Sequence, residues 1–526
     1  MKEIEKHAMT SEILPGRSAR VVAPSTQRTR WGAWSWPLAV GGVLLGAFVA
    51  RLPYLDVPIS ADVGGYATAA YWWARGDTLY DTITITRPQG VFVVFRAIEA
   101  LGLGSTRGIH LFATLWALLA TLALLAVGTR VWGRAIGLAT VGLYAAAMAT
   151  PWVQGYDANA ELLMTLPLLL GLLALLHADE RPLGDRRDLL LLTTSGLLGA
   201  GALLLKPAGV AALPLAAFWL LRRRATEGAS WRNWLAATGA LALGWAAGLA
   251  PALIHGLNTA PERYLGAVLL YRLGQDSLIG GAVGHQLDYF ATNSLYLLGH
   301  LPLLLFAPLG LRLAAHRDDR RRRALLALWL LTALGGTALG GNWFLHYYQQ
   351  VLPPLALAVA LALRWLLRRP LGPPRFAAAC LAALACLPLV LPITGGLAGG
   401  VDLKTLPEWE PNVAAVAPIA AYVQARSGPD DTLYVAYDHA DIYYLARRRP
   451  AARWLHFREL GRTPGAFAEQ VARLDDPATA PLYIVGAQTF DRWGFDPERA
   501  LRAVVTRDYG LETTIGGIEL YRHKGR

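Results

Sequence analysis

The sequence predicts an α-helical polytopic membrane protein with a small α/β domain outside the membrane at its C-terminal end. Three observations support this fold class. The 526 residues are 54% hydrophobic and only 16% charged, whereas soluble proteins carry about 25% charged residues. The apolar residues gather in runs close to the length of a membrane span. Residues 401–526 instead have ordinary charge density and short alternating runs typical of strands.

The apolar runs predict eleven membrane-spanning helices, because a helix needs roughly 20 apolar residues to cross a bilayer. One of them, 208–221, is short, but three arginines at 222–224 bound it, and we include it. The predicted spans are 34–50, 109–128, 135–150, 161–177, 189–205, 208–221, 234–254, 292–314, 324–340, 350–367 and 376–396.

Residues 89–103 are apolar but do not fit a span. Their sequence, QGVFVVFRAIEALGL, is too short and carries Arg96 and Glu99 in its middle. A charge at mid-bilayer costs about 2.5–3.5 kcal/mol on insertion scales. We therefore expect an amphipathic helix that lies on the membrane surface.

The arginines between the spans test this choice, since cytoplasmic loops carry an excess of Lys and Arg. If the N-terminus is inside and 89–103 does not span, every arginine-rich cluster falls on one side. A span at 89–103 would move the later clusters outside. The clusters are Arg130 and Arg134; Arg181, Arg186 and Arg187; Arg222, Arg223, Arg224 and Arg232; Arg317 and Arg320 to Arg323; and Arg364, Arg368, Arg369 and Arg375.

This topology divides the chain into three parts. Residues 1–33 form a cytoplasmic N-terminal tail, residues 34–400 a transmembrane domain, and residues 401–526 an extracytoplasmic soluble domain whose role stays open. In the last part, strands are expected at 432–437, 481–485 and 517–521, with a helix over 464–474. The outer surface also collects loops rich in Tyr, Trp, Asp, Asn and His, which are 51–108, 151–160, 206–207, 255–291 and 341–349.

Composition also argues against several function classes. The net charge of +12 lies largely in the short loops, which is the pattern of orientation charge rather than of a nucleic-acid groove. Cys380 and Cys386 lie in one apolar run and indicate neither a disulfide framework nor a metal knuckle. Ionisable residues gather at the outer surface and not at mid-bilayer, which favours chemistry at the interface over ion-coupled transport.

The first outer loop offers a carboxylate and a cation near the headgroup plane. Asp62 stands just beyond the first span, and a short helix is expected from Tyr66 to Arg75, ended by Gly76. A carboxylate can take the proton from a hydroxyl nucleophile, and Arg87 can neutralise a leaving phosphate. The alternative for Asp62 is a helix N-cap. The alternative for Arg87 is a headgroup contact or a surface ion pair.

The other outer loops supply candidates for the rest of a substrate cavity. One loop places Asp157, Asn159 and Glu161 at the outer end of a predicted span. The outer loop 341–349 contains the sequence HYYQ, whose first two residues are His346 and Tyr347. Helix capping is the alternative for Glu161, and aromatic-belt anchoring is the alternative for the tyrosines. Lys206 is an outward cation at a span end, with snorkelling to the headgroups as its alternative.

Taken in order, these motifs resemble a known family. RLPYLD, YATAAYWWARGDTLYD, RPQG, GYDANAELLM, LLLKPAG and HYYQQVLPP are similar to the bacterial branch of the protein O-mannosyltransferase and aminoarabinose transferase superfamily. The resemblance covers about residues 34–400. It implies a GT-C fold, a catalytic acid at Asp62, a donor-phosphate contact at Arg87 and an acid of the second loop at Glu161. Many members have Asp-Glu where this chain has Asp62-Val63, which leaves one candidate base.

The resemblance implies an integral-membrane glycosyltransferase of the bacterial inner membrane. It would transfer a sugar from a polyprenyl-phosphate carrier, with inversion, to a lipid, glycan or protein acceptor on the extracytoplasmic face. Asp62 would be the base, and the expected substrate-binding residues are Arg87, Tyr66, Asp157, Asn159, Glu161, Lys206, His346 and Tyr347. Asp62, Glu161 and His346 could share a divalent ion, but the spacing of these residues in the sequence does not require one. We therefore expect activity to survive treatment with a chelator. A lipid-linked glycan flippase and a non-catalytic scaffold are the alternatives.

Overall fold

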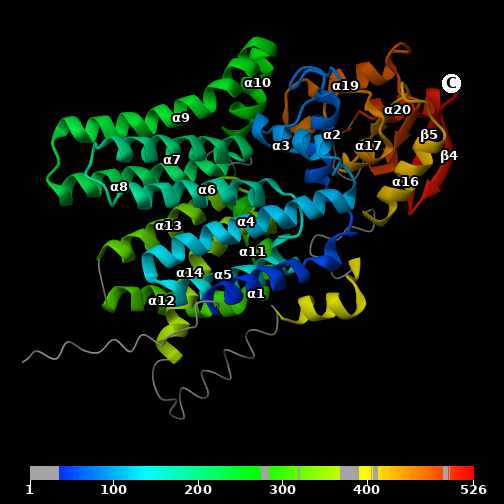
Figure 1. Ribbon diagram of the computed structural model, residues 1–526. Coiled ribbons are helices and arrows are strands. Elements are labelled where there is room, and N and C mark those ends of the chain that lie inside the picture. The colour runs from blue at the N-terminus through cyan, green and yellow to red at the C-terminus, as the bar shows by residue number, and fades with distance from the viewer. Residues whose placement is uncertain are drawn as a thin grey trace, which may run out of the picture.

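The structure, a computed structural model, describes residues 35–273, 283–317, 320–367, 390–403, 406, 413–489, 496 and 498–526. Within them, a bundle of long helices carries a smaller α/β unit at one end, which we call the C-terminal unit (residues 413–526 as far as described) (Figure 1). The predicted tail 1–33, Cys380, Cys386 and most of the predicted span 376–396 lie outside the described residues.

The bundle helices follow the predicted apolar runs. Six helical stretches among the described residues are long and apolar enough to cross a membrane: Ser35–Tyr54, Thr106–Trp132, Ala160–Ala178, Arg186–Leu205, Trp231–Thr259 and Gln286–Leu313. Shorter helices match other predicted spans, and the count of eleven stays a prediction. The bundle elements are α1 (Ser35–Val49), α4 (Thr106–Trp132), α5 (Arg134–Met148), α6 (Ala160–Ala178), α7 (Arg186–Leu205), α8 (Ala212–Glu227), α9 (Trp231–Thr259), α12 (Leu301–Arg317), α13 (Arg320–Ala338) and α14 (Leu352–Leu367).

Two short α-helices lie between α1 and α4. The helix α3 (Gln89–Ala100) buries Phe92, Phe95 and Ile98 on one face and exposes Val93 and Arg96 on the other. This spacing confirms the amphipathic helix expected at 89–103; its place on a membrane surface remains a prediction. The other helix, α2 (Ala61–Trp73), begins five residues earlier than the sequence predicts.

The loops predicted to be cytoplasmic meet at one end of the bundle. Asp179, at the end of α6, pairs with Arg222 at 2.8 Å and Arg223 at 3.5 Å, both at the end of α8. It also pairs with Arg321, at the start of α13. Three loops that are far apart in the sequence therefore share one ion-pair cluster, as the arginine pattern predicts for a common side.

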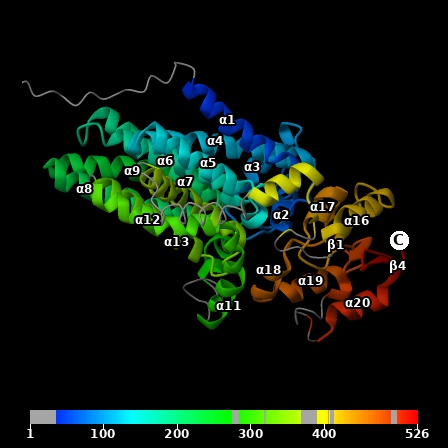
Figure 2. The same cartoon turned by 90° about the horizontal axis from the view of Figure 1, so that it is seen from below.

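The C-terminal unit is built around a five-stranded mixed sheet in the order β2-β1-β3-β5-β4. The strands β2, β1 and β3 are parallel, and β5 joins β3 and β4 in antiparallel pairs. Figures 1 and 2 show this unit beside α2. Its elements are α16 (Val413–Ala425), β1 (Thr432–Val435), α17 (Asp441–Ala446), β2 (Arg449–Pro450), α18 (Phe457–Arg462), α19 (Ala466–Asp475), β3 (Tyr483–Val485), α20 (Ala500–Asp508), β4 (Tyr509–Ile515) and β5 (Ile518–His523).

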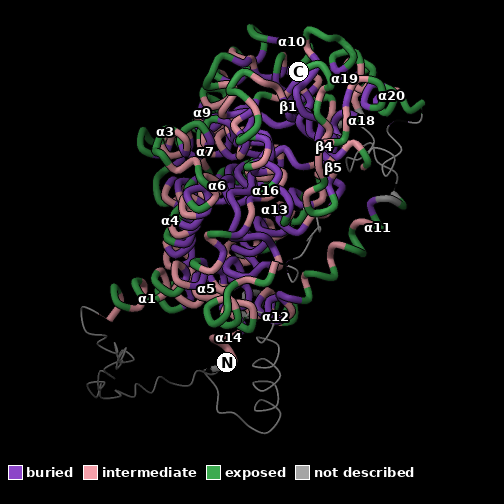
Figure 3. The backbone as a smooth tube through the Cα atoms, turned by 90° about the vertical axis from the view of Figure 1, so that its right-hand side faces the viewer, coloured by how far each residue is buried: buried purple, intermediate pink, exposed green. Residues whose placement is uncertain are grey.

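The C-terminal unit packs tightly against α2. Gly64 lies so close to Asp441, and Gly65 so close to His456, that a Cβ atom at either glycine would collide with its neighbour. The Thr68 hydroxyl donates a hydrogen bond to the Ala440 carbonyl at 2.8 Å. One apolar core includes buried residues of the bundle, of α2 and of the C-terminal unit. Figure 3 shows buried residues throughout the interior of the molecule. The first outer loop is thus enclosed between the two parts of the molecule.

Candidate active site

Asp62 lies in the first turn of α2 and is not its cap. Ser60 occupies the N-cap position, and its side chain accepts a hydrogen bond from Val63 N at 3.4 Å. The alternative role of Asp62 as an N-cap is therefore wrong. The Asp62 side chain keeps 32% of its surface exposed and lines a large cavity. It is available for chemistry there.

Arg87 reaches Asp62 from the loop that ends at α3. Its Nη2 lies 3.7 Å from Asp62 Oδ2, and its Nε donates a hydrogen bond to the Tyr66 hydroxyl at 3.2 Å. Because the Arg87 side chain is largely buried, the surface ion pair considered from the sequence does not describe it. The guanidinium is held beside Asp62, a first-loop carboxylate that lines the cavity.

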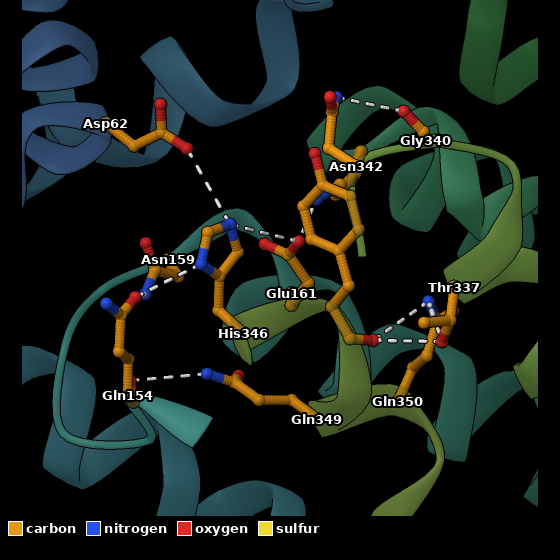
Figure 4. Close-up of polar contacts among 12 residues, drawn as sticks. Asp62, Gln154, Asn159, Glu161, Thr337, Gly340, Asn342, His346, Gln349 and Gln350 are labelled. Atoms are coloured by element: carbon orange, nitrogen blue, oxygen red, sulfur yellow. Dashed lines mark hydrogen bonds and ion pairs between the residues drawn. The ribbon is translucent and has the colours of Figure 1, made fainter. Parts of the chain in front are cut away.

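His346 stands between two carboxylates from different helices. Its Nε2 lies 3.8 Å from Asp62 Oδ2 and 3.7 Å from Glu161 Oε1. Its Nδ1 lies 3.1 Å from Oε1 of Gln154. Figure 4 shows the imidazole ring between these groups. The short helix η6 (Leu345–Gln350) carries His346 to this position, and Gln349 donates to the Val153 carbonyl at 2.7 Å, which ties η6 to the second outer loop.

Glu161 and Lys206 form a buried pair behind His346. Glu161 lies in the first turn of α6, where the helix dipole favours a carboxylate, and its Oε1 pairs with Lys206 Nζ. The Lys206 ammonium also lies over the Tyr347 ring, 3.5 Å from its centroid. The side chains of Glu161 and Lys206 are 1% and 7% exposed, so Lys206 does not snorkel to headgroups. The site thus holds two ion pairs, Arg87–Asp62 and Glu161–Lys206, with the His346 ring between their two carboxylates.

Asp157 and Asn159 support the site from behind. Asp157 Oδ2 accepts a hydrogen bond from Ser60 N at 3.0 Å, which fixes the start of α2. Asn159 Nδ2 donates to Gln154 Oε1 at 3.4 Å, the same oxygen that His346 contacts. The sequence leads us to expect these two residues and Glu161 in the cavity wall. They lie one layer deeper instead, because the turn that begins α6 folds them inward.

The cavity has a volume of about 1610 Å³ and opens between the bundle and the C-terminal unit. From the bundle side, Asp62, Arg87, Gln154, His346 and Tyr347 line it. The opposite wall includes side chains that the sequence does not link to the site: Asp438, His439, Arg453, Trp454, His456 and Glu459, with Glu262 and Arg263 at the rim. The Gly64-Gly65 pair is the one signal that could have found this wall, because adjacent glycines in a helix allow another segment to approach closely.

The electrostatics of the site fix the charge of its key groups. Burial raises the pKa of Asp62, but the positive charge of Arg87, supported by that of Lys206, outweighs burial and holds the pKa of that carboxyl well below its usual range. Burial lowers the pKa of His346 to about 3; Lys206 and Arg87 act in the same direction, and Asp62 opposes them. At neutral pH, Asp62 is therefore ionised and His346 is neutral. In the part of the chain that the structure describes, no group of three or more His, Cys, Asp or Glu side chains is placed to hold a metal ion.

No protein-family profile and no curated protein matches the sequence. Solved structures do match the fold. ArnT from Cupriavidus metallidurans bound to undecaprenyl phosphate aligns with 93% of this chain and 98% of its own, with a TM-score of 0.63 and 16% identity. The apo oligosaccharyltransferase of Archaeoglobus fulgidus aligns with 92% of this chain and 73% of its own, with a TM-score of 0.58 and 15% identity. The same archaeal protein, AglB, in complex with an inhibitory peptide and a dolichol-phosphate, aligns with 91% of this chain and 73% of its own at a TM-score of 0.51 and 13% identity. The chain has the GT-C fold that these structures share.

Proposed function

We propose that this GT-C-fold chain is an integral-membrane glycosyltransferase of the bacterial inner membrane. It transfers a sugar from a polyprenyl-phosphate-sugar donor to a hydroxyl group of a lipid, glycan or protein acceptor on the extracytoplasmic face. The observation that carries the proposal is the pairing of an ionised Asp62 with a buried Arg87 in the wall of one large cavity. The structural neighbours add support, since one was solved with undecaprenyl phosphate and another with a dolichol-phosphate.

Arg87 binds the phosphate group of the donor. Burial lowers the pKa of Arg87, but the Tyr66 hydroxyl and the Asp62 carboxylate beside it outweigh burial, so its pKa lies above the usual value and the side chain stays charged. Arginine offers a planar fork of donors that matches a phosphate group. Charge grows on the carrier phosphate as the sugar leaves, and a fixed cation lowers the energy of that transition state.

Asp62 acts as the general base for the acceptor hydroxyl. In the transfer, the acceptor oxygen bonds to the anomeric carbon while the bond from that carbon to the phosphate oxygen breaks. The hydroxyl proton passes to the Asp62 carboxylate, and the carrier leaves as a phosphate monoester. A single displacement of this kind inverts the anomeric carbon. Arg87 keeps Asp62 weakly basic, and a donor phosphate that draws the guanidinium towards itself restores basicity to Asp62 when both substrates are bound.

The remaining residues shape the cavity around this pair. His346 is neutral and can donate or accept a hydrogen bond at Nε2, the nitrogen that faces both carboxylates. Tyr347 offers an aromatic face beside it, held by the Lys206 ammonium. We assign His346 and Tyr347 to sugar and acceptor contacts, and Tyr66, Glu161, Lys206, Asp157 and Asn159 to holding these side chains in place.

Transfer from labelled donors in proteoliposomes tests the proposal. A panel of radiolabelled polyprenyl-phosphate sugars is offered to the full chain and to Asp62→Asn, which removes the base and keeps the size of the side chain. Loss of a general base typically costs about 10²–10⁴-fold in rate. We expect transfer by the wild type and a loss of this order in the variant, at equal expression and equal thermal stability.

Two outcomes contradict the proposal in different ways. Equal rates of sugar transfer by both proteins would show that Asp62 is not the base. If neither protein turns over any donor in the panel, the proposed glycosyltransferase activity is wrong. A repeat of the assay with EDTA is expected to leave the rate unchanged, and complete loss there would overturn the metal-free mechanism.

A further inference from the structure

The loop that carries Arg87 is paired with the C-terminal unit along its backbone. Thr84 N donates a hydrogen bond to the Arg453 carbonyl at 2.7 Å, and Leu455 N donates to the Thr84 carbonyl at 3.4 Å. Thr84 and Trp454 form an isolated parallel β-bridge. Residues more than 360 positions apart in the sequence thus run side by side next to the cavity.

Glu459 extends this pairing to the residue before Arg87. It lies on α18 and is 4% exposed. Its Oε1 accepts a hydrogen bond from Thr86 N at 2.9 Å and another from the Thr86 hydroxyl. A buried carboxylate is costly unless donors surround it, so the two bonds from Thr86 fix the position of the carboxylate and of the loop together.

The opposite side of the same loop is held from within the first outer loop. The Tyr80 hydroxyl donates to the Arg87 carbonyl at 2.8 Å, and Arg87 N donates to the Ile85 carbonyl at 2.8 Å. The backbone at Thr86 and Arg87 is therefore clamped between Tyr80 and Glu459. From this fixed backbone, the Arg87 side chain extends to Asp62 and Tyr66.

We infer that Glu459 is a positioning residue for Arg87, and that the C-terminal unit thereby sets the place where the carrier phosphate binds. The inference rests on the proposed function of Arg87. Small displacements of a binding group are enough to weaken a site of this kind, since misplacement by about 1 Å can cost about 10²-fold. Glu459 acts through Thr86 and Arg87 and does not need to touch the substrate.

The first test measures the loop itself and needs no substrate. Amide hydrogen exchange is followed in a peptide covering residues 80–90 of the detergent-solubilised full chain. In Glu459→Ala, exchange at Thr86 should become faster by about tenfold or more, because its amide loses its acceptor. Glu459→Gln keeps an oxygen that can accept from Thr86 and should restore much of the protection. Unchanged protection in Glu459→Ala overturns the inference, whatever the chain catalyses.

A matched variant separates positioning from loss of stability. Glu512 lies in the same C-terminal unit, and its Oε1 also accepts two hydrogen bonds, from the Tyr422 and Tyr483 hydroxyls at 2.7 and 3.0 Å. Glu512→Ala should lower thermal stability without changing exchange at Thr86. Faster exchange at Thr86 in both variants would mean that the unit loosens as a whole and that Glu459 has no specific role.

The second test asks whether Glu459 acts through Arg87. Binding of undecaprenyl phosphate to the full chain is measured for the wild type, Glu459→Ala, Arg87→Ala and the double variant. Glu459→Ala should weaken binding about tenfold, and the double variant should bind no more weakly than Arg87→Ala alone, because groups that act as a unit are not additive. Independent losses that add in the double variant would contradict the inference. Absence of binding by the wild type would instead count against the proposed function and leave the exchange result to decide the role of Glu459.

Discussion

At the scale of single residues, the main feature of the site is that it places several charged side chains in a largely buried environment. Arg87 and Asp62 form one ion pair of the site and Lys206 and Glu161 form another, and buried charges are tolerated only when they are paired. The chain meets this condition with these two ion pairs, and the neutral His346 lies between their two acids. Because each member holds its neighbour, removal of one is expected to disturb the next.

The Glu161–Lys206 pair should respond strongly to the loss of one partner. Lys206→Met leaves a buried carboxylate without its cation, which typically costs about 3–5 kcal/mol of unfolding free energy. The double variant Glu161→Leu, Lys206→Met removes both charges and should recover most of the loss. Thermal unfolding of the purified chain in detergent measures both effects. Arg107→Met, which breaks an exposed pair with Asp56, is the control and should change stability little.

His346 should make folding stability depend on pH. Its pKa is lowered to about 3 in the folded chain from an ordinary value of 6.5. Below pH 6.5 the unfolded chain therefore binds a proton that the folded chain does not, and stability falls as the pH decreases through the window from 6.5 to 3. We expect a loss of about 2 kcal/mol between pH 7.5 and pH 5 that is absent in His346→Gln. An identical loss in both proteins would show that His346 titrates normally.

At the scale of elements, α2 decides the geometry of the site. Its N-cap, Ser60, is itself fixed by Asp157, so the second outer loop sets where the first turn and Asp62 lie. The sequence predicts a short helix only from Tyr66 to Arg75, after the glycine pair. The glycines are instead inside the helix, where they leave room for Asp441 and His456.

Gly64→Ala should therefore detach the C-terminal unit from α2. The added methyl group meets the backbone and Cβ of Asp441, and overpacking of this kind usually costs about 1–3 kcal/mol. We expect a lower melting temperature and faster proteolysis of residues 413–526. Gly46→Ala in α1, where the new methyl group meets open space, is the matched control. A melting temperature unchanged in Gly64→Ala would mean that the close approach is not needed.

At the scale of the whole molecule, the bundle has two chemically different ends. The ion-pair cluster around Asp179 marks one end, and the cavity between the bundle and the C-terminal unit marks the other. The predicted topology places the first end in the cytoplasm and the second outside it. Chemical labelling of the two ends tests this predicted topology.

A membrane-impermeant maleimide should distinguish the two ends. In a background where Cys380 and Cys386 are replaced by alanine, single cysteines are placed at two exposed positions, Asp430 in the C-terminal unit and Pro182 in the loop after α6. In cells whose outer membrane has been permeabilised and whose inner membrane is intact, Asp430→Cys should react with the maleimide. Pro182→Cys should react only after the cells are lysed. The reverse pattern would invert the topology, and labelling of both would contradict the predicted number of spans.

The elements whose signal is local could be predicted from the sequence. Runs of apolar residues gave the bundle helices and the amphipathic α3, and alternation gave the strands β1, β3 and β5, because span length and side-chain period depend only on neighbouring residues. The sequence also gathered Asp62, Arg87, Glu161, Lys206 and His346 as a set of outward polar residues. Which of these residues face the cavity depends on the packing of the folded chain, as does the placement of Glu459 and His456 on its other side. Contacts between residues more than 370 positions apart depend on how the C-terminal unit packs against α2, and no local pattern encodes that packing.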